Sequence, residues 1–450
     1  MVKTHRLMQE KTLTRAIQVF LAVLVLGRIA LKWRVVVFCD LRYFVVTAGQ
    51  ILKGISPYHP ENNPPPYLYP LQPPSMSLLS MPLCFTPELF QNLLFFIGGI
   101  LFFFAYTFMV FNYYGFSPKK ILEARWSNVP VWITLALIFV SSSFLTVIVQ
   151  GQDSCFVCFF LFLVLLYPKN DKGANVIFLA LAAAMKYSLL TMQVPVLIFQ
   201  KRWRVSILSL ILFLVMFLSV GLWLNGIIPA LIDYINLVIT ETQKGCNSHV
   251  GSISLSLVDV GFFRYHFLNT IIKVFLLVLY FLTLRKIWRR GRKESGDAKG
   301  LGGFPERLTA LEWTSFTMLT MVISYHRNYD CLLFLPFVGV VFLEVLNKAC
   351  AQRKFKGANL AALIGLSVIL LYWAAPLSSI YKFEYVLGTL FPFGRKLVYY
   401  TGYQPMQIYD VSFPFTKIFM LLSVFFVFAM ELSPFFDAQI GCEQKDDKTT

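Results

Sequence analysis

The chain has 450 residues, of which 57% are hydrophobic and only 14% are charged, and its mean hydropathy is +0.65. An assembly of soluble domains is excluded, because soluble domains carry about a quarter charged residues. The net charge of +17 does not indicate a nucleic-acid-binding protein, since the 40 lysines and arginines fall in short segments between apolar runs. The composition predicts a protein with many membrane spans, surrounded by membrane lipid and without a nucleic-acid partner.

The expected spans are apolar segments of about 20 residues, the length that crosses a bilayer as a helix. The first span follows a basic N-terminus without a cleavage site, so residues 1–13 are expected to form a cytoplasmic tail ahead of an uncleaved helix. The expected spans are 14–37, 88–111, 129–149, 153–167, 205–223, 266–284, 308–324, 331–347, 358–375 and 414–431. We predict an all-α polytopic membrane protein with about 10–12 transmembrane helices, folded as a single membrane-embedded domain over residues 1–450.

The first outer loop, residues 39–87, lies between the first two spans. Apolar residues recur there at helical spacing from Tyr43 to Leu52 and stop before Gly54, which predicts an amphipathic helix at the membrane interface. Asp40 stands where the spanning helix ends and this interfacial helix begins. Two interpretations of Asp40 stay open at this point: a helix cap or ion-pair partner of Arg42, and a functional carboxylate.

The topology depends on residues 174–200, an apolar segment with Lys186 at its centre and the basic run "QKRWR" at its end. A single crossing would put that run on the outer side, against the rule that lysine and arginine stay in the cytoplasm. Two short half-helices with Lys186 near the apex satisfy the rule, and we predict this hairpin. The cytoplasmic side then includes a flexible basic loop over 285–307 and a tail over 432–450, and the longer outer pieces are 39–87, 224–265, 325–330 and 376–413.

The remaining polar groups at helix ends all fall on the predicted outer side. They lie in "VIVQGQDS", with Gln152 and Asp153, in "AAAMKYSLL", with Lys186, and in "SYHRNYD", with His326, Arg327 and Asp330. Ionisable residues are costly in a membrane and tend to mark function. Taken alone, Lys186 can be an anchor whose ammonium reaches the interface, and His326 can be a structural turn residue. Their common side favours one shared site.

Four segments of the sequence together resemble a known enzyme family. They are "CDLRYFVVTAGQILKGISPYHPE", "YLYPLQPPSMSLLSMPL", the stretch from "VIVQGQDS" through "AAAMKYSLL", and "SYHRNYDCLLFLP". The resemblance is to glycosyltransferase family 87, polytopic enzymes of the glycosyltransferase C superfamily that include polyprenol-phosphate-mannose-dependent mannosyltransferases. It covers roughly residues 38–340, and the chain departs from the family at Ser154, where asparagine is frequent.

The resemblance implies roles for particular residues. Asp40 matches the catalytic aspartate of the first outer loop, Tyr58 ends the family's G-x-x-P-Y element, Gln152 matches the glutamine of a Gly-Gln turn, and Lys186 matches an intramembrane lysine. His326 and Asp330 match a polar turn after a late helix. With the other polar residues of the outer side added, the predicted site has Asp40 as catalytic base, Lys186, His326 and Arg327 at the donor phosphate, and Arg42, Tyr58, Gln152, Asp153 and Asp330 at the substrates.

The predicted reaction needs few protein groups. A polyprenyl-phosphate donor carries a leaving group that is already an anion, so one carboxylate that activates the acceptor hydroxyl is enough, and attack opposite the phosphate inverts the anomeric centre. Positive charge in a partly desolvated site favours the departing phosphate. No cofactor and no dedicated metal site are expected, although one aspartate and the phosphate together can hold a divalent ion.

We therefore predict an enzyme that moves a mannose-like hexose or arabinofuranose from a polyprenyl phosphate to a glycolipid or polysaccharide acceptor. It is expected in the cytoplasmic (inner) membrane, with its active site facing outside. The alternatives are a secondary transporter, which Lys186 fits equally well, and a surface-polysaccharide polymerase or ligase with a lipid-diphosphate donor. A transporter commonly shows a matching repeat in its second half, and the sequence contains none.

Overall fold

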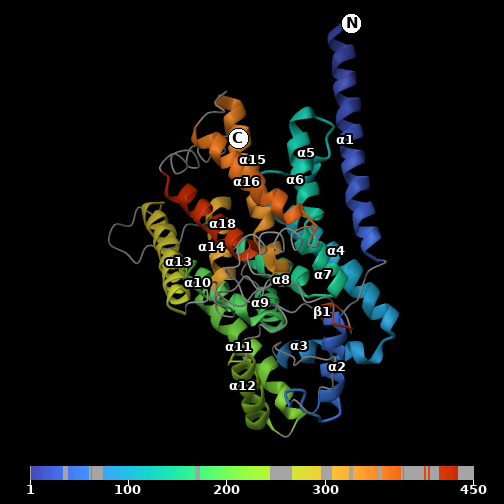
Figure 1. Cartoon of the computed structure of the whole chain (residues 1–450), viewed down its shortest axis with the longest axis vertical. Helices are drawn as coiled ribbons and strands as arrows, with labels where there is room; N and C mark the ends of the chain where they lie inside the picture. The colour runs from blue at the N-terminus through green and yellow to red at the C-terminus, as the bar shows by residue number, and fades with distance from the viewer. Residues whose placement is uncertain are drawn as a thin grey trace.

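The computed structural model of the chain is an irregular bundle of helices, with one long N-terminal helix along its side (Figure 1). The structure describes residues 2–33, 39–59, 62, 74–167, 173–224, 226–243, 266–294, 307–323, 328–352, 357–376, 379, 400–401, 404–405 and 415–433. His326 and Arg327, predicted at the donor phosphate, lie outside these residues.

The described elements are helices and short 3₁₀ turns, labelled α and η. In the first part of the chain they are α1 (Val2–Trp33), α2 (Cys39–Leu52), α3 (Pro74–Ser80), η2 (Met81–Phe85), α4 (Glu88–Tyr113), α5 (Pro118–Ile121), η3 (Trp126–Asn128), α6 (Val129–Phe139), α7 (Ser142–Gln150) and α8 (Ser154–Leu165). There follow α9 (Gly173–Met185), η4 (Tyr187–Leu189), α10 (Leu190–Phe199), α11 (Trp203–Ser219), η5 (Val220–Leu222), α12 (Ile227–Gln243), α13 (His266–Glu294), α14 (Ala310–Ile323), η6 (Asn328–Leu333), α15 (Leu335–Gln352), α16 (Ala358–Ala374) and α18 (Phe415–Leu432).

The predicted all-α class is confirmed. The described strands, β1 (Tyr400–Thr401) and β2 (Gln404–Pro405), are two residues long and form one antiparallel pair. The described residues contain three helical stretches that are long and apolar enough to cross a membrane, namely Met8–Trp33, Glu88–Tyr113 and Trp203–Leu222. Shorter apolar helices of 10–17 residues accompany them, so the protein is polytopic. The number of 10–12 transmembrane helices stays a prediction.

One expected span is broken. The segment predicted to cross as a single helix over 129–149 forms α6 and α7, which are bent by 42° around Val140 and Ser141. The Ser141 hydroxyl accepts a hydrogen bond from the backbone N–H of Phe144, which caps the start of α7. A side-chain cap of this kind lets a helix restart in a new direction inside an apolar run.

Three helical stretches lie where the sequence indicated tails or loops. Helix α1 already begins at Val2, so residues 2–13 of the expected tail are helical. Helix α13 continues to Glu294, which corrects the flexible loop predicted from residue 285, and α12 occupies much of the expected outer loop 224–265. The reason is the same at α1 and α13: lysine, arginine, glutamate and glutamine are good helix formers, so a helix runs on past its apolar part.

One hydrophobic core joins the two halves of the chain. Its buried side chains run from Val25 on α1 to Met430 on α18. Stacked rings form its centre: Trp313 of α14 lies against Phe337 of α15, with ring centroids 5.8 Å apart, and Tyr106 of α4 lies against Phe162 of α8 at 5.2 Å. The apolar surface that helices from both halves bury together holds the site described below in position.

The hairpin predicted at Lys186 is confirmed. Its contacts with the two ends of α8 show in which direction each of its helices runs. The Lys186 ammonium donates to the Ser154 hydroxyl, at the first residue of α8. The side chains of Gln200 and Arg202 donate to the carbonyl oxygens of Leu165 and Val164, at the last residues of α8. Helix α9 therefore runs along α8 toward Ser154 and α10 returns, which gives a hairpin with Lys186 at its apex.

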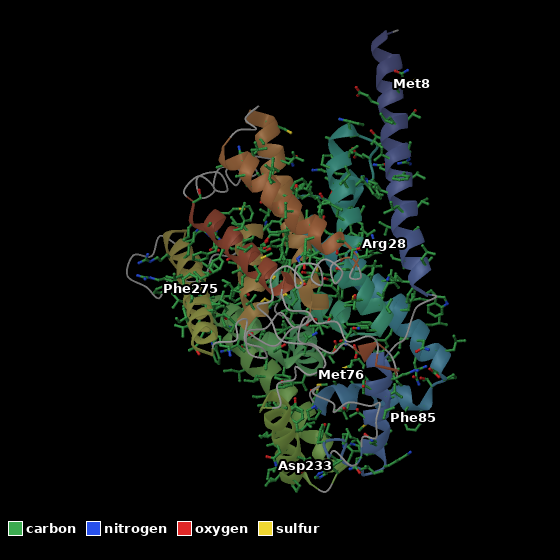
Figure 2. All side chains as sticks on the ribbon, in the orientation of Figure 1. Met8, Arg28, Met76, Phe85, Asp233 and Phe275 are labelled. Carbon is green, nitrogen blue, oxygen red and sulfur yellow. The ribbon has the colours of Figure 1, made fainter. Side chains whose placement is uncertain are left out.

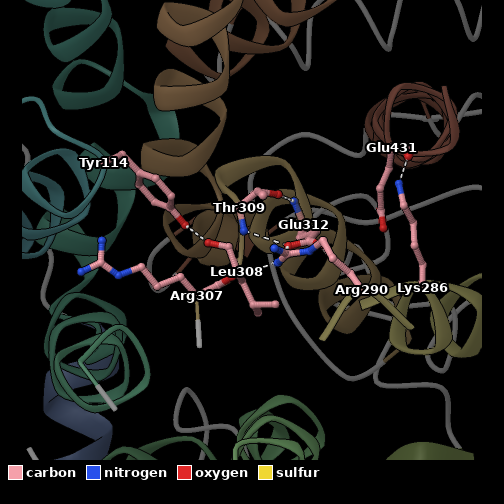
Figure 3. Close-up of polar contacts among 8 residues, drawn as sticks. All are labelled: Tyr114, Lys286, Arg290, Arg307, Leu308, Thr309, Glu312 and Glu431. Atoms are coloured by element: carbon pink, nitrogen blue, oxygen red, sulfur yellow. Dashed lines mark hydrogen bonds and ion pairs between the residues drawn. The ribbon is translucent and has the colours of Figure 1, made fainter. Parts of the chain in front are cut away.

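A charged network joins α13 to the start of α14 (Figure 3). Arg290 of α13 donates from Nε and Nη2 to the two carboxylate oxygens of Glu312 on α14, at 2.8 and 2.6 Å. Glu312 and Thr309 form a reciprocal capping box, with bonds of 2.8 and 3.1 Å to each other's backbone N–H. Arg290 also donates to the carbonyl oxygen of Arg307 at 2.8 Å. We call Arg290, Arg307, Thr309 and Glu312 the Arg290 network.

Candidate functional site

Asp40 occupies the first turn of α2, the helix that the sequence predicted at the membrane interface. The side chains of Phe44, Ala48 and Ile51 form the buried face of this helix, and it packs against α3 and η2. Helix α2 also touches α7, and Asp40 itself is buried at that end. The side-chain amide of Gln152 donates a hydrogen bond to Oδ2 of Asp40. The two residues are 112 positions apart in the sequence, so only the fold brings them together.

A glycine turn between α7 and α8 presents Gln152 to Asp40. Gly151 ends α7 in the left-handed conformation, with φ of +69°, and its backbone N–H donates to the carbonyl oxygen of Val147. Glycine suits this position because a side chain is strained at positive φ. The next three residues, Gln152, Asp153 and Ser154, are all buried, so the turn carries three consecutive polar side chains into the protein.

Ser154 binds the second half of the site. Its hydroxyl donates to Oδ1 of Asp330 at 2.7 Å and accepts from the Lys186 ammonium at 3.0 Å. Lys186 also forms an ion pair with the same Asp330 oxygen at 2.5 Å, and the Asp330 side chain is only 1% exposed. Lys186 reaches this position because it stands between α9 and η4 in a non-helical conformation. Broken helices in membranes commonly place polar groups at such sites.

The turn 152–154 therefore joins the two halves. We call Asp40, Gln152, Asp153, Ser154, Lys186 and Asp330 the Asp40 cluster. Asp153 lies in the turn, outside both helices, and interacts electrostatically with Lys186, Asp330 and Asp40. Burial raises the pKa of Asp153 to about 6; Lys186 opposes this shift, and the negative charges of Asp330 and Asp40 add to it.

The other predicted site residues lie outside the Asp40 cluster. Arg42, on the exposed side of α2, pairs with Glu88 at the start of α4, with 2.7 Å between Nη2 and Oε1. Tyr58 is buried against Tyr234 of α12, with ring centroids 5.4 Å apart. Its neighbour in α3 is Ser77, and α3 in turn contacts α9 just before the hairpin apex. Helix α3 thus lies between Tyr58 and the end of α9.

The sequence prediction missed Ser154 as a site residue. Its bonds to Lys186 and Asp330 make it the centre of the second half of the cluster. The signal that could have found it was the departure from the family, which frequently has asparagine there. A residue that replaces a polar group at the end of a Gly-Gln turn has the same position and can make the same kind of contact.

The structure gives no direct sign of a metal centre. Among the described residues, no group of three or more His, Cys, Asp or Glu side chains is arranged to hold a metal ion. The expectation that the protein has no dedicated metal site stays a prediction.

In this arrangement a buried carboxylate, Asp40, and a partly buried lysine, Lys186, both bind the turn between α7 and α8 of a polytopic membrane protein. A sequence model of glycosyltransferase family 87 matches residues 67–305, more than half of the chain. The chain belongs to glycosyltransferase family 87. The match includes Gln152, Ser154 and Lys186, while Asp40 and Asp330 lie on either side of it. Neither the curated proteins nor the solved structures include a match.

Family membership decides between an enzyme and a transporter. The protein is a membrane glycosyltransferase, so the transporter that fitted Lys186 equally well is set aside. A glycosyltransferase uses a sugar donor and an acceptor, and the Asp40 cluster is where we look for both.

Proposed function

We propose that this family 87 enzyme transfers a mannose-like hexose or an arabinofuranose from a polyprenyl phosphate to a glycolipid or polysaccharide acceptor. The reaction takes place on the outer side of the cytoplasmic membrane and inverts the anomeric centre. One observation carries the proposal: the turn 152–154 binds Asp40 through Gln152 and Lys186 through Ser154. The candidate base and the candidate phosphate ligand are therefore held by the same turn.

Asp40 is the proposed general base. A phosphate leaving group needs no proton, so the reaction requires one carboxylate rather than the acid and base pair of a glycoside hydrolase. Gln152 donates to one oxygen of Asp40 and restricts the rotation of the carboxylate. A restrained carboxylate can take the proton of the acceptor hydroxyl as that oxygen attacks the sugar.

Lys186 is the proposed ligand of the donor phosphate. An ammonium group has three donors and no fixed plane, so it can bind phosphate while it keeps a contact to Ser154. The N-terminus of α8 begins at Ser154, and the partial positive charge of a helix N-terminus favours an anion there. Asp330 serves as the counter-ion of Lys186 before the donor binds.

A donor phosphate in the Asp40 cluster needs more positive charge than Lys186 alone supplies, because carboxyl groups already lie around it. Three carboxyl groups, Asp40, Asp153 and Asp330, accompany Lys186, the basic member of the cluster that the structure describes. A donor phosphate would add more negative charge. His326 and Arg327, close to Asp330 in the sequence, are the proposed source of the compensating positive charge.

The test is Asp40→Asn in membranes supplied with radiolabelled polyprenyl-phosphate mannose, or in parallel with the arabinofuranose donor. We expect sugar transfer to fall by roughly 10²–10⁴, the usual contribution of a general base. Asparagine has the size of aspartate and still accepts a bond from Gln152, so the melting temperature in detergent should hardly change. The matched control is Glu88→Gln, an exposed carboxylate at the start of α4, which should keep wild-type transfer. Wild-type transfer by Asp40→Asn would show that Asp40 is not the base.

A further inference from the structure

Helix α12 lies at the end of the molecule away from the N-terminus, where Figure 2 labels Asp233. Gly226, with φ of +118°, separates it from η5 and the end of α11. Gly221 lets the two segments approach, because a Cβ at Gly221 would lie 2.4 Å from the Cα of Ile227. Helix α12 is thus a direct continuation of α11 after a sharp turn.

One face of α12 is fastened to the first outer loop. Tyr234 packs on Tyr58 and also on Phe217 of α11, with centroid distances of 5.4 and 5.5 Å. Oδ2 of Asp233 accepts from the Ser56 hydroxyl at 3.3 Å and lies 3.1 Å from Nε2 of His59. Ala230, Tyr234 and Leu237 are buried on this face. The contacts hold α12 in a defined orientation.

The opposite face of α12 is apolar and uncovered. Ile228, Ile232 and Ile235 follow each other at spacings of four and three residues, and their side chains are 70%, 51% and 44% exposed. Leu222 and Trp223, just before α12, are 74% and 49% exposed. Single exposed apolar residues are normal, but a contiguous patch of large ones marks a contact with lipid or with another protein.

We infer that this isoleucine face, Ile228, Ile232 and Ile235, contacts the hydrocarbon of the bilayer. Helix α12 follows directly on α11, which belongs to a stretch long and apolar enough to cross a membrane, and Leu222 and Trp223 between the two helices are also exposed. The exposed apolar side chains of α11 are Ile207, Leu208, Ile211, Leu214 and Val215. Trp223 stands at the junction, and tryptophan is enriched where a protein crosses the membrane interface.

The inference changes the environment of residues 227–238, because the sequence analysis expected an outer loop in water there. Water around the isoleucine face would cost about 25 cal/mol for each Å² of apolar surface, and lipid removes this cost. A second copy of the chain could also cover the face, but the face follows an exposed apolar turn at the end of a membrane-spanning stretch and has the same aliphatic composition as the exposed side chains of α11. The inference does not depend on the donor, the acceptor or the role of Asp40.

A photo-crosslinking side chain, benzoylphenylalanine, at Ile232 of the full-length protein in phosphatidylcholine vesicles tests the inference. Ile211 on α11 is the matched lipid-facing control, and Lys119 in the short polar segment after α4 is the water-facing control. We expect lipid adducts at Ile232 in a yield comparable to Ile211 and several-fold above Lys119, detected by mass spectrometry. The same label at Ile228 should agree.

Each other outcome overturns the inference. A yield at Ile232 as low as at Lys119 would place the helix in water. A crosslinked dimer in place of lipid adducts would show that a second copy covers the face. Size-exclusion elution of each labelled protein establishes that it is folded before irradiation.

Discussion

The Asp40 cluster and the Arg290 network are both built from buried charged residues, yet they differ in how the charges are satisfied. In the Arg290 network, both oxygens of Glu312 accept from Arg290, and the same carboxylate also caps α14. In the Asp40 cluster, a single oxygen of Asp330 accepts from both Ser154 and Lys186, and Asp153 is buried among other carboxyl groups. In the Arg290 network each oxygen of the carboxylate has its own arginine donor, whereas in the Asp40 cluster two donors share one oxygen.

This difference indicates that the Arg290 network has a structural role and the Asp40 cluster a functional one. A two-pronged arginine–carboxylate pair that also caps a helix fastens α13 to α14, and a ligand could only weaken it. Several buried carboxyl groups gathered around one lysine are costly in a membrane protein, and such clusters tend to mark a functional site. The Arg290 network lies at the far end of α8: Arg307 stacks on Tyr113, which packs on Tyr167 just after that helix.

Among the variants that compare the two charged regions, the largest effect is expected from removal of the Lys186 charge. Lys186→Met should lower transfer by roughly 10²–10³, the usual loss when one group that stabilises the transition-state charge is removed. It should also lower the melting temperature, because Asp330 is buried and would lose its counter-ion. Transfer and melting temperature are both measured on purified protein.

The double variant Lys186→Met with Asp330→Asn separates the two roles of the pair. With both charges gone, the melting temperature should recover, while transfer should stay low. If transfer recovers together with stability, Lys186 is only structural, and the contrast between the two charged regions fails.

The Arg290 network should show the reverse pattern. Arg290→Met leaves the buried Glu312 carboxylate without its two-pronged partner and should cost about 2–3 kcal/mol, below the full value for a deeply buried pair because Arg290 is partly exposed. Transfer per folded molecule should stay at the wild-type level. Thermal unfolding and transfer are measured on the same preparation.

Arg290→Met with Glu312→Gln is the matched compensation. It removes the uncompensated charge and should regain part of the lost stability. A fall in specific transfer in either variant, at a temperature where the protein is folded, would show that this end of the bundle also takes part in catalysis.

The smallest effect concerns Asp153 and pH. Because the folded protein raises its pKa from 3.8 to about 6, the folded state holds the proton more tightly than the unfolded state does. The resulting stability is complete below the unfolded pKa and is lost as pH rises through about 6. Asp153→Asn removes this dependence. The melting temperature of the variant minus that of the wild type should therefore rise by a few degrees from acidic to neutral pH. A constant difference across that range would contradict the raised pKa.

The elements that the sequence predicted well are those with a local physical signal. The apolar run of α4 and the end of α2 before Gly54 follow from hydropathy and from glycine at positive φ. The hairpin at Lys186 also follows, since the charge rule applies to each short loop separately. Helix α12 did not follow, because its 17 residues include polar side chains such as Asp233 and Asn236 and its length is below a full span.

The site was only partly predictable for a related reason. Asp40, Gln152 and Lys186 belong to recognisable segments. Their chemical nature and their location on one side of the membrane could therefore be predicted. The bond from Gln152 to Asp40 and the shared oxygen of Asp330 join residues more than 100 positions apart. The role of Ser154 appeared only when its two partners were in place.

The sequence by itself determined that the chain is a bundle of membrane helices with a hairpin at Lys186, because apolar length and the sidedness of charge act locally along the chain. The tertiary structure alone decided which carboxylate meets which cation, that α6 and α7 bend apart, and that α12 turns its isoleucines outward. Those outcomes depend on packing between segments that are distant in the chain, and no local pattern of residues records them.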